Sequence, residues 1–240
     1  MNVMGYVQRL SQAIGRRKAL KLDAAFSTLD RRVVFNKIYS QNVWGKKSGH
    51  RFFSGPGSHD VNLVVPYVQS IKTFLRALNE KPSVVDLGCG DFNVGQHLRP
   101  GFENYIACDV VPDLIAHNAK QFEALSVDFR CLDMIEDALP KADVVMLREV
   151  FQHLSNQAII SIIDKISLTY RYLILTEDIP PDDHFVANLD KPIGPSTRAQ
   201  FGSGVVLDAG PFHMKFLSKE IICEIPRENS RLRTTLYRFS

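Results

Sequence analysis

The sequence contains few cysteines, and their spacing excludes two classes of protein. Only four occur in 240 residues, at positions 89, 108, 131 and 223, with no paired or CxxC arrangement. This spacing argues against a disulfide framework or a zinc site and is typical of a protein from a reducing compartment. Cys108 and Cys131 lie in apolar runs, which predicts that both are small core residues.

Long apolar runs are also absent. No stretch approaches the roughly 18–20 residues of a membrane span, and the first residues lack the apolar core of a secretory signal. We therefore expect a cytoplasmic protein. The composition, 45% hydrophobic and 23% charged, is ordinary for a globular chain, and the length fits one large domain or a domain with an appendage.

The overall charge of +3 hides a basic front end. Residues 1–47 hold ten lysines and arginines against two acids, a net charge of +8, which leaves −5 for the rest of the chain. Such a segment could contact an anionic lipid surface, a nucleic acid, a nucleotide sugar or a phosphorylated substrate. A solvated helix face is the simpler interpretation.

The front third is predicted to form a cap of helices and a loop over residues 1–80. Apolar spacing favours helices at 6–22, 28–40 and 61–78. Between the last two, residues 44–58 contain four glycines, one proline and three aromatic residues, which favours a shaped loop.

Residues 81–240 show a different pattern, in which short apolar runs alternate with helical segments. This alternation predicts an α/β fold with a doubly wound parallel sheet. A helix is expected at 112–124, and another that Ser155 caps and that runs to 168. An irregular stretch at 178–212 precedes two closing strands that form an antiparallel hairpin. The expected strands are 83–87, 105–109, 127–132, 143–147, 172–176, 214–224 and 231–239.

A glycine loop follows the first strand, in the segment Val84–Gly95 (VVDLGCGDFNVG). Open α/β sheets bind ligands at the carboxyl ends of their strands, and glycine lets the backbone approach a ligand closely. Asp109 ends the next strand, 23 residues after Asp86, where a carboxylate can accept hydrogen bonds from ribose hydroxyls. The combination predicts a ligand that contains adenosine.

The details of the loop favour one such ligand. Dinucleotide sites normally use G-x-G-x-x-G, but the third position here is Asn93 and the next glycine is Gly95. Asp86, two residues before the first glycine, would repel a pyrophosphate and suits a ligand with a cationic amino group. S-adenosylmethionine carries an ammonium and a sulfonium. A dinucleotide, or a tight turn without a ligand, remains the alternative.

Residues 84–95, 105–110, 131–134 and 143–154 resemble the motifs of class I S-adenosylmethionine-dependent methyltransferases. The resemblance implies a Rossmann-like, seven-stranded, mostly parallel sheet with an antiparallel C-terminal hairpin strand and an N-terminal helical extension. It also implies that the loop with Asp86, Gly88 and Gly90 wraps the methionine part of the cofactor. In the same way it places Asp109 and Val110 at the ribose and Asp133 and Met134 at the adenine, and we count Arg148 in this cofactor set.

The front loop carries a finer resemblance. Tyr39, Trp44-Gly45 and Ser54-Gly55-Pro56-Gly57-Ser58 look like a stretch found before the glycine loop in a subgroup of bacterial methyltransferases. That subgroup is loosely associated with glycan and secondary-metabolite synthesis. Gly49, His50 and Arg51 interrupt its usual pattern. We expect Trp44, Ser54, Gly55, Gly57 and Ser58 at the substrate or the cofactor carboxylate; a packing turn with Trp44 as a buried anchor is the alternative.

Methyl transfer is an in-line displacement in which the enzyme aligns the nucleophile and excludes water. An oxygen nucleophile also needs a general base. His153, after the fourth strand, is the first candidate and Glu149 the second, although either could instead line the cofactor or form an ion pair. Glu177 and Asp178 are expected as an acidic pair at the mouth of the site. Two acids without a third ligand do not predict a metal site.

The sequence thus predicts S-adenosylmethionine-dependent methyl transfer to a small molecule or glycan, with oxygen as the favoured acceptor atom. A nucleic-acid methyltransferase that uses the basic N-terminus, a non-catalytic member and a nicotinamide-dependent oxidoreductase stay as alternatives. The sequence lacks the Asn/Asp-Pro-Pro-Tyr/Phe motif of enzymes that methylate nucleic-acid amino groups, so we do not expect a nucleic-acid partner. The oligomeric state, including a homodimer, is left open.

Overall fold

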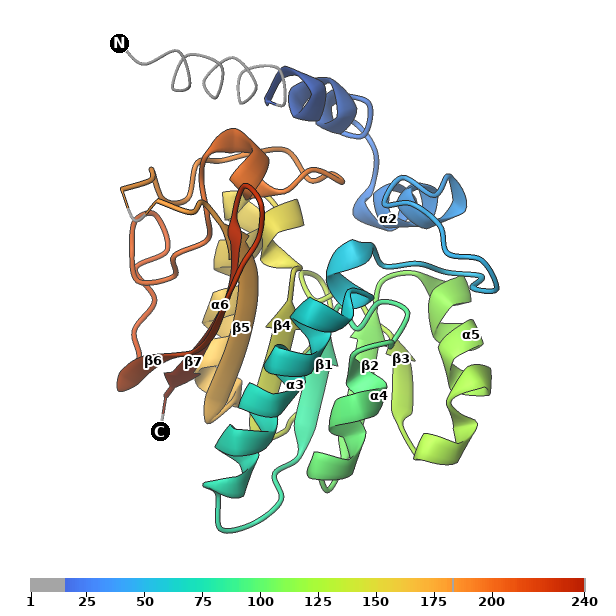
Figure 1. Ribbon diagram of the computed structural model, residues 1–240, viewed down its shortest axis with the longest axis vertical. Coiled ribbons are helices and arrows are strands. Elements are labelled where there is room, and N and C mark those ends of the chain that lie inside the picture. Colours follow the sequence, from blue (N-terminus) through green and yellow to red (C-terminus); the bar gives the residue numbers. More distant parts are fainter. Residues whose placement is uncertain (1–15, 183, 240) are drawn as a thin grey trace.

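A seven-stranded sheet organises the chain in the computed structural model, which describes residues 16–182 and 184–239 (Figure 1). The strand order is β3-β2-β1-β4-β5-β7-β6. The first five of these are parallel, and β7 runs antiparallel to both β5 and β6, as the sequence predicts. The strands are β1 (Val84–Leu87), β2 (Tyr105–Asp109), β3 (Asp128–Cys131), β4 (Val144–Arg148), β5 (Tyr172–Ile179), β6 (Ser218–Pro226) and β7 (Arg231–Arg238).

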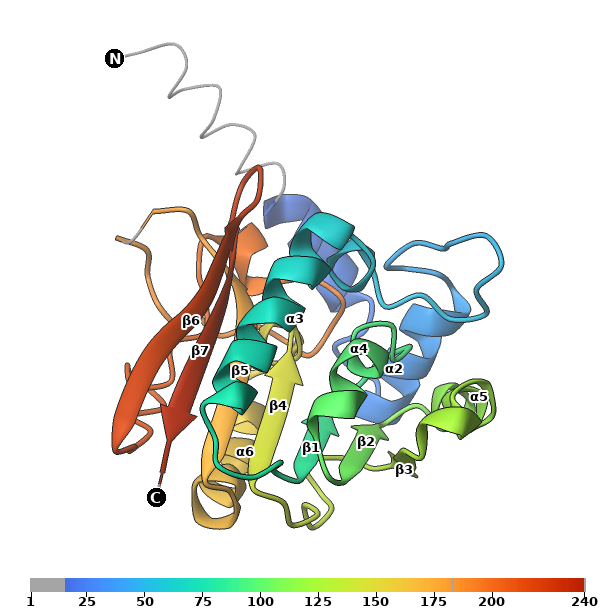
Figure 2. The same ribbon diagram turned by 60° about the horizontal axis from the view of Figure 1, so that its bottom comes forward.

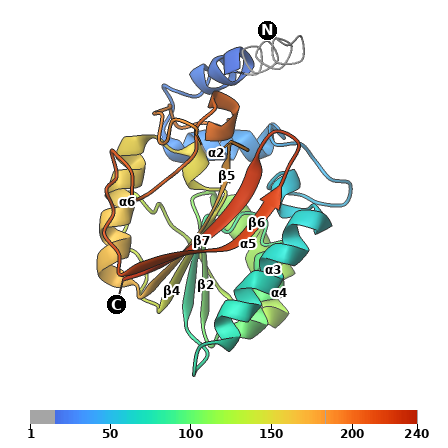
Figure 3. The same cartoon turned by 60° about the vertical axis from the view of Figure 1, so that its left-hand side comes forward.

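Helices cover both faces of this sheet (Figures 2 and 3). Helix α6 lies on one face, and α3 and α4 lie on the other. Each face of the sheet has its own buried apolar cluster. The α-helices are α2 (Arg31–Ser40), α3 (Val61–Arg76), α4 (Gly95–Leu98), α5 (Pro112–Gln121) and α6 (Asn156–Thr169). The 3-10 helices are η1 (Pro56–Ser58), η2 (Arg99–Gly101), η3 (Glu123–Leu125), η4 (Phe151–His153) and η5 (Arg198–Phe201).

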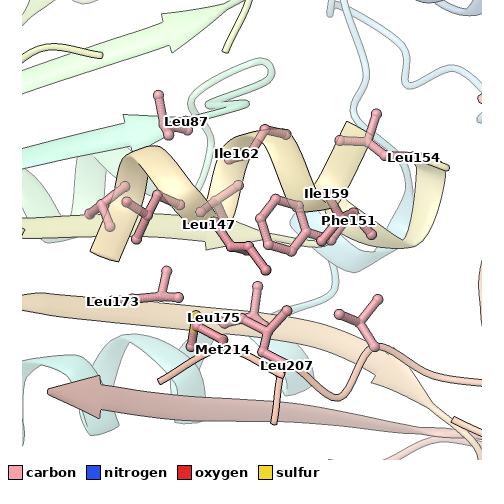
Figure 4. Packing of buried hydrophobic residues seen from close by; sticks show 14 of the residues in the cluster. Leu87, Leu147, Phe151, Leu154, Ile159, Ile162, Leu173, Leu175, Leu207 and Met214 are labelled. Carbon is pink, nitrogen blue, oxygen red and sulfur yellow. The ribbon is translucent and has the colours of Figure 1, made fainter. Parts of the chain in front are cut away.

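The middle strands are apolar because both of their faces are covered. Every residue of β1 is buried, and so are the first four of β4. This explains the near-continuous valine and leucine runs of these strands, since a strand open to water on one face would alternate. On the α6 side, Leu147, Phe151 and Ile159 pack together (Figure 4).

Several local signals act as the sequence predicts. The side chain of Ser155 accepts a hydrogen bond from the backbone N–H of Ala158 and caps α6. Pro112 occupies the first turn of α5, where its missing N–H costs nothing. The expected loop between α2 and α3 contains the single-turn helix η1.

Two strands differ from the sequence-based expectation by several residues. Strand β5 extends to Ile179, beyond the expected end at 176, because β7 pairs with it along its whole length. Strand β6 begins at Ser218 and ends at Pro226.

The expectation that Cys131 is a core residue is wrong. Cys131 is exposed, whereas Cys108 is buried. The reason is topological, because Cys131 lies on β3, the edge strand of the sheet, where three of the four residues are exposed. An apolar run on an edge strand does not guarantee burial.

The first described helix, residues 16–24, is attached to a distant part of the chain. The rest of the helix expected over 6–22 lies outside the described residues. Asp23 forms an ion pair with Lys191, at 3.2 Å, and both side chains are at most 2% exposed. Asp23 also accepts a hydrogen bond of 3.0 Å from the backbone N–H of Ser196. The helix therefore fixes part of the irregular stretch that precedes β6.

Among the described residues, no helix combines the length and the apolar character needed to cross a membrane.

Asp23→Asn should lower the free energy of unfolding by about 3–5 kcal/mol, because it leaves the buried Lys191 ammonium without its counter-charge. Burial already lowers the pKa of Lys191, despite the opposing effect of Asp23. In the variant, Lys191 binds its proton more weakly in the folded chain than in the unfolded chain. The free energy of unfolding of the variant should therefore rise as pH approaches the ordinary pKa of lysine. Urea unfolding measures both effects. An equal loss in Asp164→Asn, on the exposed side of α6, would refute the assignment.

Candidate cofactor and acceptor site

A cavity of about 670 Å³ lies at the carboxyl ends of the parallel strands. Ligand pockets typically measure roughly 300–1,000 Å³. The cavity lies where the chain order reverses between β1 and β4, the usual place for a ligand in an open α/β sheet. Its walls come from the ends of β1, β2, β3 and β4, from the front loop, from residues 195–200 and from the β6–β7 turn.

Two glycines of the loop are required both by their backbone conformation and by the side chains packed against them. Gly88 and Gly90 have φ values of +76° and +56°, in the region that favours glycine. A Cβ on Gly90 would lie 2.4 Å from Oγ of Ser54, and one on Gly88 would lie 2.6 Å from Cγ2 of Val150. Both glycines are therefore required even before a ligand is considered.

Two buried carboxylates border the cavity beside this loop. Asp86 accepts a hydrogen bond of 2.8 Å from the hydroxyl of Tyr105. Asp109 accepts hydrogen bonds from the backbone N–H groups of Gly90, at 3.1 Å, and Val111, at 3.2 Å. Burial raises the pKa of Asp86 and that of Asp109 to about 6, against the lowering effect of these hydrogen bonds. Neither carboxylate has a cationic partner at hydrogen-bond distance among the described residues.

The front loop is bonded directly to the glycine loop. The backbone N–H of Ser54 donates to Oδ2 of Asp91 at 2.9 Å, and the N–H of Asp91 donates to Oγ of Ser54 at 2.8 Å. The hydroxyl of Tyr39 lies 2.9 Å from the same Oγ, and Nε2 of His59 lies 2.6 Å from Oδ2 of Asp91. Sequence reasoning missed Asp91 and His59, although Asp91 directly follows Gly90.

The end of the front loop, Ser54–Ser58, also borders the cavity. Gly55 has φ of +88°. The carbonyl of Gly57 accepts a hydrogen bond of 2.8 Å from Arg148, and the carbonyl of Ser58 accepts one of 2.6 Å from the amide of Asn93. The predicted set from Trp44 to Ser58 is thus brought together with the glycine loop.

At the end of β4, an acid is held between two arginines. Glu149 accepts hydrogen bonds from Arg148, at 2.8 Å, and from Arg227 on the β6–β7 turn, at 3.0 Å. Burial would raise the pKa of Glu149, but the two guanidinium groups hold it below its ordinary value. The backbone of Glu149 has φ of +56°, which is uncommon for a residue with a side chain. Sequence reasoning missed Arg227.

His153 borders the same cavity and faces an aromatic wall. Its ring centroid lies 4.9 Å from that of Trp44, whose Nε1 donates to the carbonyl of Pro195 at 3.1 Å. Burial, together with the nearby Lys191, lowers the pKa of His153 to about 4. The imidazole is therefore neutral at neutral pH and can accept a hydrogen bond.

Asp133 and Met134, predicted at the adenine, border the cavity after β3. Asp133 forms an ion pair of 3.2 Å with Arg31, on α2, and its other oxygen accepts a hydrogen bond from the N–H of Ile135. Arg31 is a further cavity residue that sequence reasoning missed.

The expectation that Glu177 and Asp178 form an acidic pair at the mouth is wrong. Neither residue borders the cavity. Because both belong to the extended strand β5, their side chains point to opposite faces. Glu177 accepts hydrogen bonds from the backbone N–H groups of Phe151 and Gln152 at the start of η4, and Asp178 forms an ion pair with Arg227 at 3.3 Å.

No cluster of three or more potential His, Cys, Asp or Glu metal ligands occurs in the described part of the chain.

Glu177 should make the stability of the protein depend on pH. Burial raises the pKa of Glu177 to about 8, despite the two backbone donors. Between the ordinary carboxyl value and about 8, the folded chain holds a proton that the unfolded chain has released. The free energy of unfolding should therefore fall as pH rises through this window, by up to about 1.4 kcal/mol per pH unit. Urea titrations of Glu177→Gln should show a flatter profile, and Glu220→Gln, at an exposed position of β6, should not.

Comparison with known proteins finds a family match for the middle of the chain. Residues 85–168, from β1 to α6, match the family model for a methyltransferase domain. No curated protein matches the chain.

Solved structures share the fold at low sequence identity. Magnesium protoporphyrin IX methyltransferase from Synechocystis PCC 6803, with bound S-adenosylmethionine, is 15% identical, with a TM-score of 0.58 over 88% of this chain and 99% of that one. The N-methyltransferase NodS from Bradyrhizobium japonicum WM9, in complex with S-adenosylhomocysteine, is 12% identical, with a TM-score of 0.57 over 83% of this chain and 96% of that one. Residues 85–168 thus resemble a methyltransferase domain, and the chain shares its fold with these two methyltransferases, whose structures hold S-adenosylmethionine or S-adenosylhomocysteine.

Proposed function

We propose that this protein is an enzyme that binds S-adenosylmethionine in the cavity and transfers its methyl group to an acceptor bound in the same cavity. The observation that carries the proposal is the meeting of three features at one sheet edge. These are the glycine loop, the two buried carboxylates Asp86 and Asp109, which have no cationic partner at hydrogen-bond distance among the described residues, and the neutral His153 beside Trp44. The sulfonium of the cofactor supplies the activated methyl group.

The residues at the glycine-loop end fit this cofactor. Asp86 is a buried acid without a cationic partner in the described chain, and it would pair with the ammonium of the methionine part. Asp109 retains lone pairs beyond its two backbone bonds and would accept hydrogen bonds from the ribose hydroxyls. Val110, Asp133 and Met134 border the cavity farther along the same edge and would flank the adenine.

The residues at the other end fit an acceptor. Trp44, Glu149 and His153 line the cavity, as does Arg227 from the β6–β7 turn. Arg148, which the sequence places in the cofactor set, is hydrogen-bonded to Glu149 and to the carbonyl of Gly57. Methyl transfer needs an aligned nucleophile and little water, which a partly aromatic pocket provides. The acceptor we favour is a small molecule or a glycan that presents an oxygen.

The geometry ranks the two candidate bases. Both carboxylate oxygens of Glu149 already accept a hydrogen bond from an arginine, so Glu149 acts instead by holding Arg148 and Arg227 in place. His153 is neutral and would accept the proton of an acceptor hydroxyl. Its low pKa makes it a weak base, so alignment contributes more to catalysis than proton transfer does.

Asp86→Asn and Asp109→Asn should each weaken the binding of S-adenosylmethionine by about 1–3 kcal/mol, because each removes a charged hydrogen-bond acceptor. Isothermal titration with S-adenosylmethionine and S-adenosylhomocysteine measures this, with Asp113→Asn on the exposed side of α5 as the matched control.

In the wild type, the affinity for S-adenosylmethionine should fall as pH drops below about 6, where both Asp86 and Asp109 take up a proton. Absence of binding, or unchanged affinity in both variants, would refute the cofactor site.

Once a screen with methyl-labelled cofactor has found an acceptor, the pH profile tests His153. If the neutral imidazole is required, kcat/KM for the acceptor, measured with the cofactor kept saturating below pH 6, should decline only near the pKa of about 4, well below the ordinary value for histidine. His153→Gln should lower kcat by about 10²-fold or more if the ring takes the proton. Glu149→Gln should raise KM more than it lowers kcat. An unchanged kcat and an unchanged pH profile in His153→Gln would contradict the assignment.

A further inference from the structure

The two arginines at the proposed acceptor end are held by acids of the protein itself. Arg148 donates to Glu149 at 2.8 Å and to the carbonyl of Gly57, also at 2.8 Å. Arg227 donates to the other oxygen of Glu149 at 3.0 Å and forms an ion pair of 3.3 Å with Asp178. All four charged side chains are at most 21% exposed. Two positive charges are therefore already matched by two negative ones.

No further cation is available on the described walls of the cavity. The third arginine that borders it, Arg31, forms an ion pair of 3.2 Å with Asp133 at the proposed adenine end. No described lysine borders the cavity. Lys191, which lies near His153, is buried and paired with Asp23. An anionic group in the cavity would thus find no uncompensated cation among the described residues.

Two further acids lie at the acceptor end. Asp60, which caps α3, and Glu228, on the β6–β7 turn, both border the cavity and are exposed. They lie on the same side of it, because Leu63 of α3 packs in one cluster with Ile225 of β6, and the start of α3 lies beside the turn (Figure 3). Neither acid forms an ion pair with another described residue. With the pairs above, this end holds four acids against two arginines.

This balance of charge disfavours an anionic acceptor. A phosphate or carboxylate could bind Arg148 or Arg227 only by displacing a buried acid, which would lose its counter-charge. It would also enter a region of net negative charge. A neutral group meets neither cost, and an ammonium is attracted. On the basis of the proposed function, we propose that the acceptor is an uncharged or cationic molecule, with no phosphate or carboxylate beside the group that is methylated.

The proposal narrows the acceptor classes that the basic front end of the sequence suggested. The exposed cations of the first described helix, at positions 16, 17, 18 and 21, do not border the cavity. They therefore give no reason to expect a phosphate inside it. Nucleotide sugars and phosphorylated sugars are disfavoured as acceptors, whereas unphosphorylated glycans, neutral hydroxylated molecules and molecules with an amino group fit.

Trp44 can report on ligands at this end, because it borders the cavity and is the sole tryptophan of the chain. Three probes share a nitrophenyl ring, which quenches tryptophan fluorescence, and differ in charge at neutral pH: 4-nitrobenzyl alcohol, 4-nitrobenzylamine and 4-nitrobenzoate. Saturating S-adenosylhomocysteine keeps the probes out of the cofactor end. The alcohol and the protonated amine should each bind at least about tenfold more tightly than the benzoate does, because only the benzoate adds a like charge.

Glu149→Gln should shift this order, because it leaves one arginine charge without its acid. The affinity for 4-nitrobenzoate should rise about tenfold, and that for the amine should fall. Glu220→Gln, at an exposed position of β6 away from the cavity, is the matched control and should change neither affinity. Glu228→Gln, at an exposed position, should weaken binding of the amine without affecting the alcohol, which tests the charge balance even if circular dichroism shows that Glu149→Gln is unfolded.

The proposal is overturned if 4-nitrobenzoate binds the wild type as tightly as the alcohol does, or if no probe quenches Trp44. It is also overturned if a folded Glu149→Gln variant keeps the wild-type ratio of benzoate to amine affinity. Failure of the proposed function has a separate signature, which is the absence of S-adenosylhomocysteine binding in isothermal titration. The order of the three probes, measured without S-adenosylhomocysteine, would then still decide the charge preference of the cavity.

Discussion

The reciprocal hydrogen bonds between Ser54 and Asp91 hold the two halves of the site together. Each residue donates its backbone N–H to the side chain of the other, so the front loop cannot shift without breaking both bonds. This contact places Oγ of Ser54 against Gly90 and makes glycine necessary there. It also fixes Ser54–Ser58 as part of the wall of the cavity. The bonds cross the predicted boundary between residues 80 and 81, so cap and domain share one site.

Similar burial has opposite consequences at the two ends of the cavity. At the glycine loop, Asp86 and Asp109 have no cationic partner at hydrogen-bond distance among the described residues, and burial raises their pKa values. At the end of β4, Glu149 is buried as well, but Arg148 and Arg227 lower its pKa. In the proposed site, Asp86 is therefore available to an ammonium group and Asp109 to hydroxyl donors, whereas Glu149 already has its partners. Two arginines at hydrogen-bond distance set the pKa of Glu149 apart from those of Asp86 and Asp109.

The sequence predicts those features that depend on residues close to one another along the chain. The strands, the cap at Ser155 and the glycine loop follow from local patterns and agree with the structure. Arg31, His59 and Arg227 were missed because each meets its partner across 32 to 102 residues, and no local pattern reports such a contact. Glu177 was misplaced because the length of β5 depends on its pairing with β7, and Cys131 because its strand lies at the edge.

The two segments that looked least informative in the sequence explain each other in the fold. The basic front end and the irregular stretch before β6 meet at Asp23 and Lys191. Burying this pair removes one acid and one base from the surface, so the net charge of the molecule does not change. The local balance does change, because the acid comes from a helix that has no other. A buried ion pair, which contributes little net stability compared with an apolar pair, can thus determine where a surface is positive.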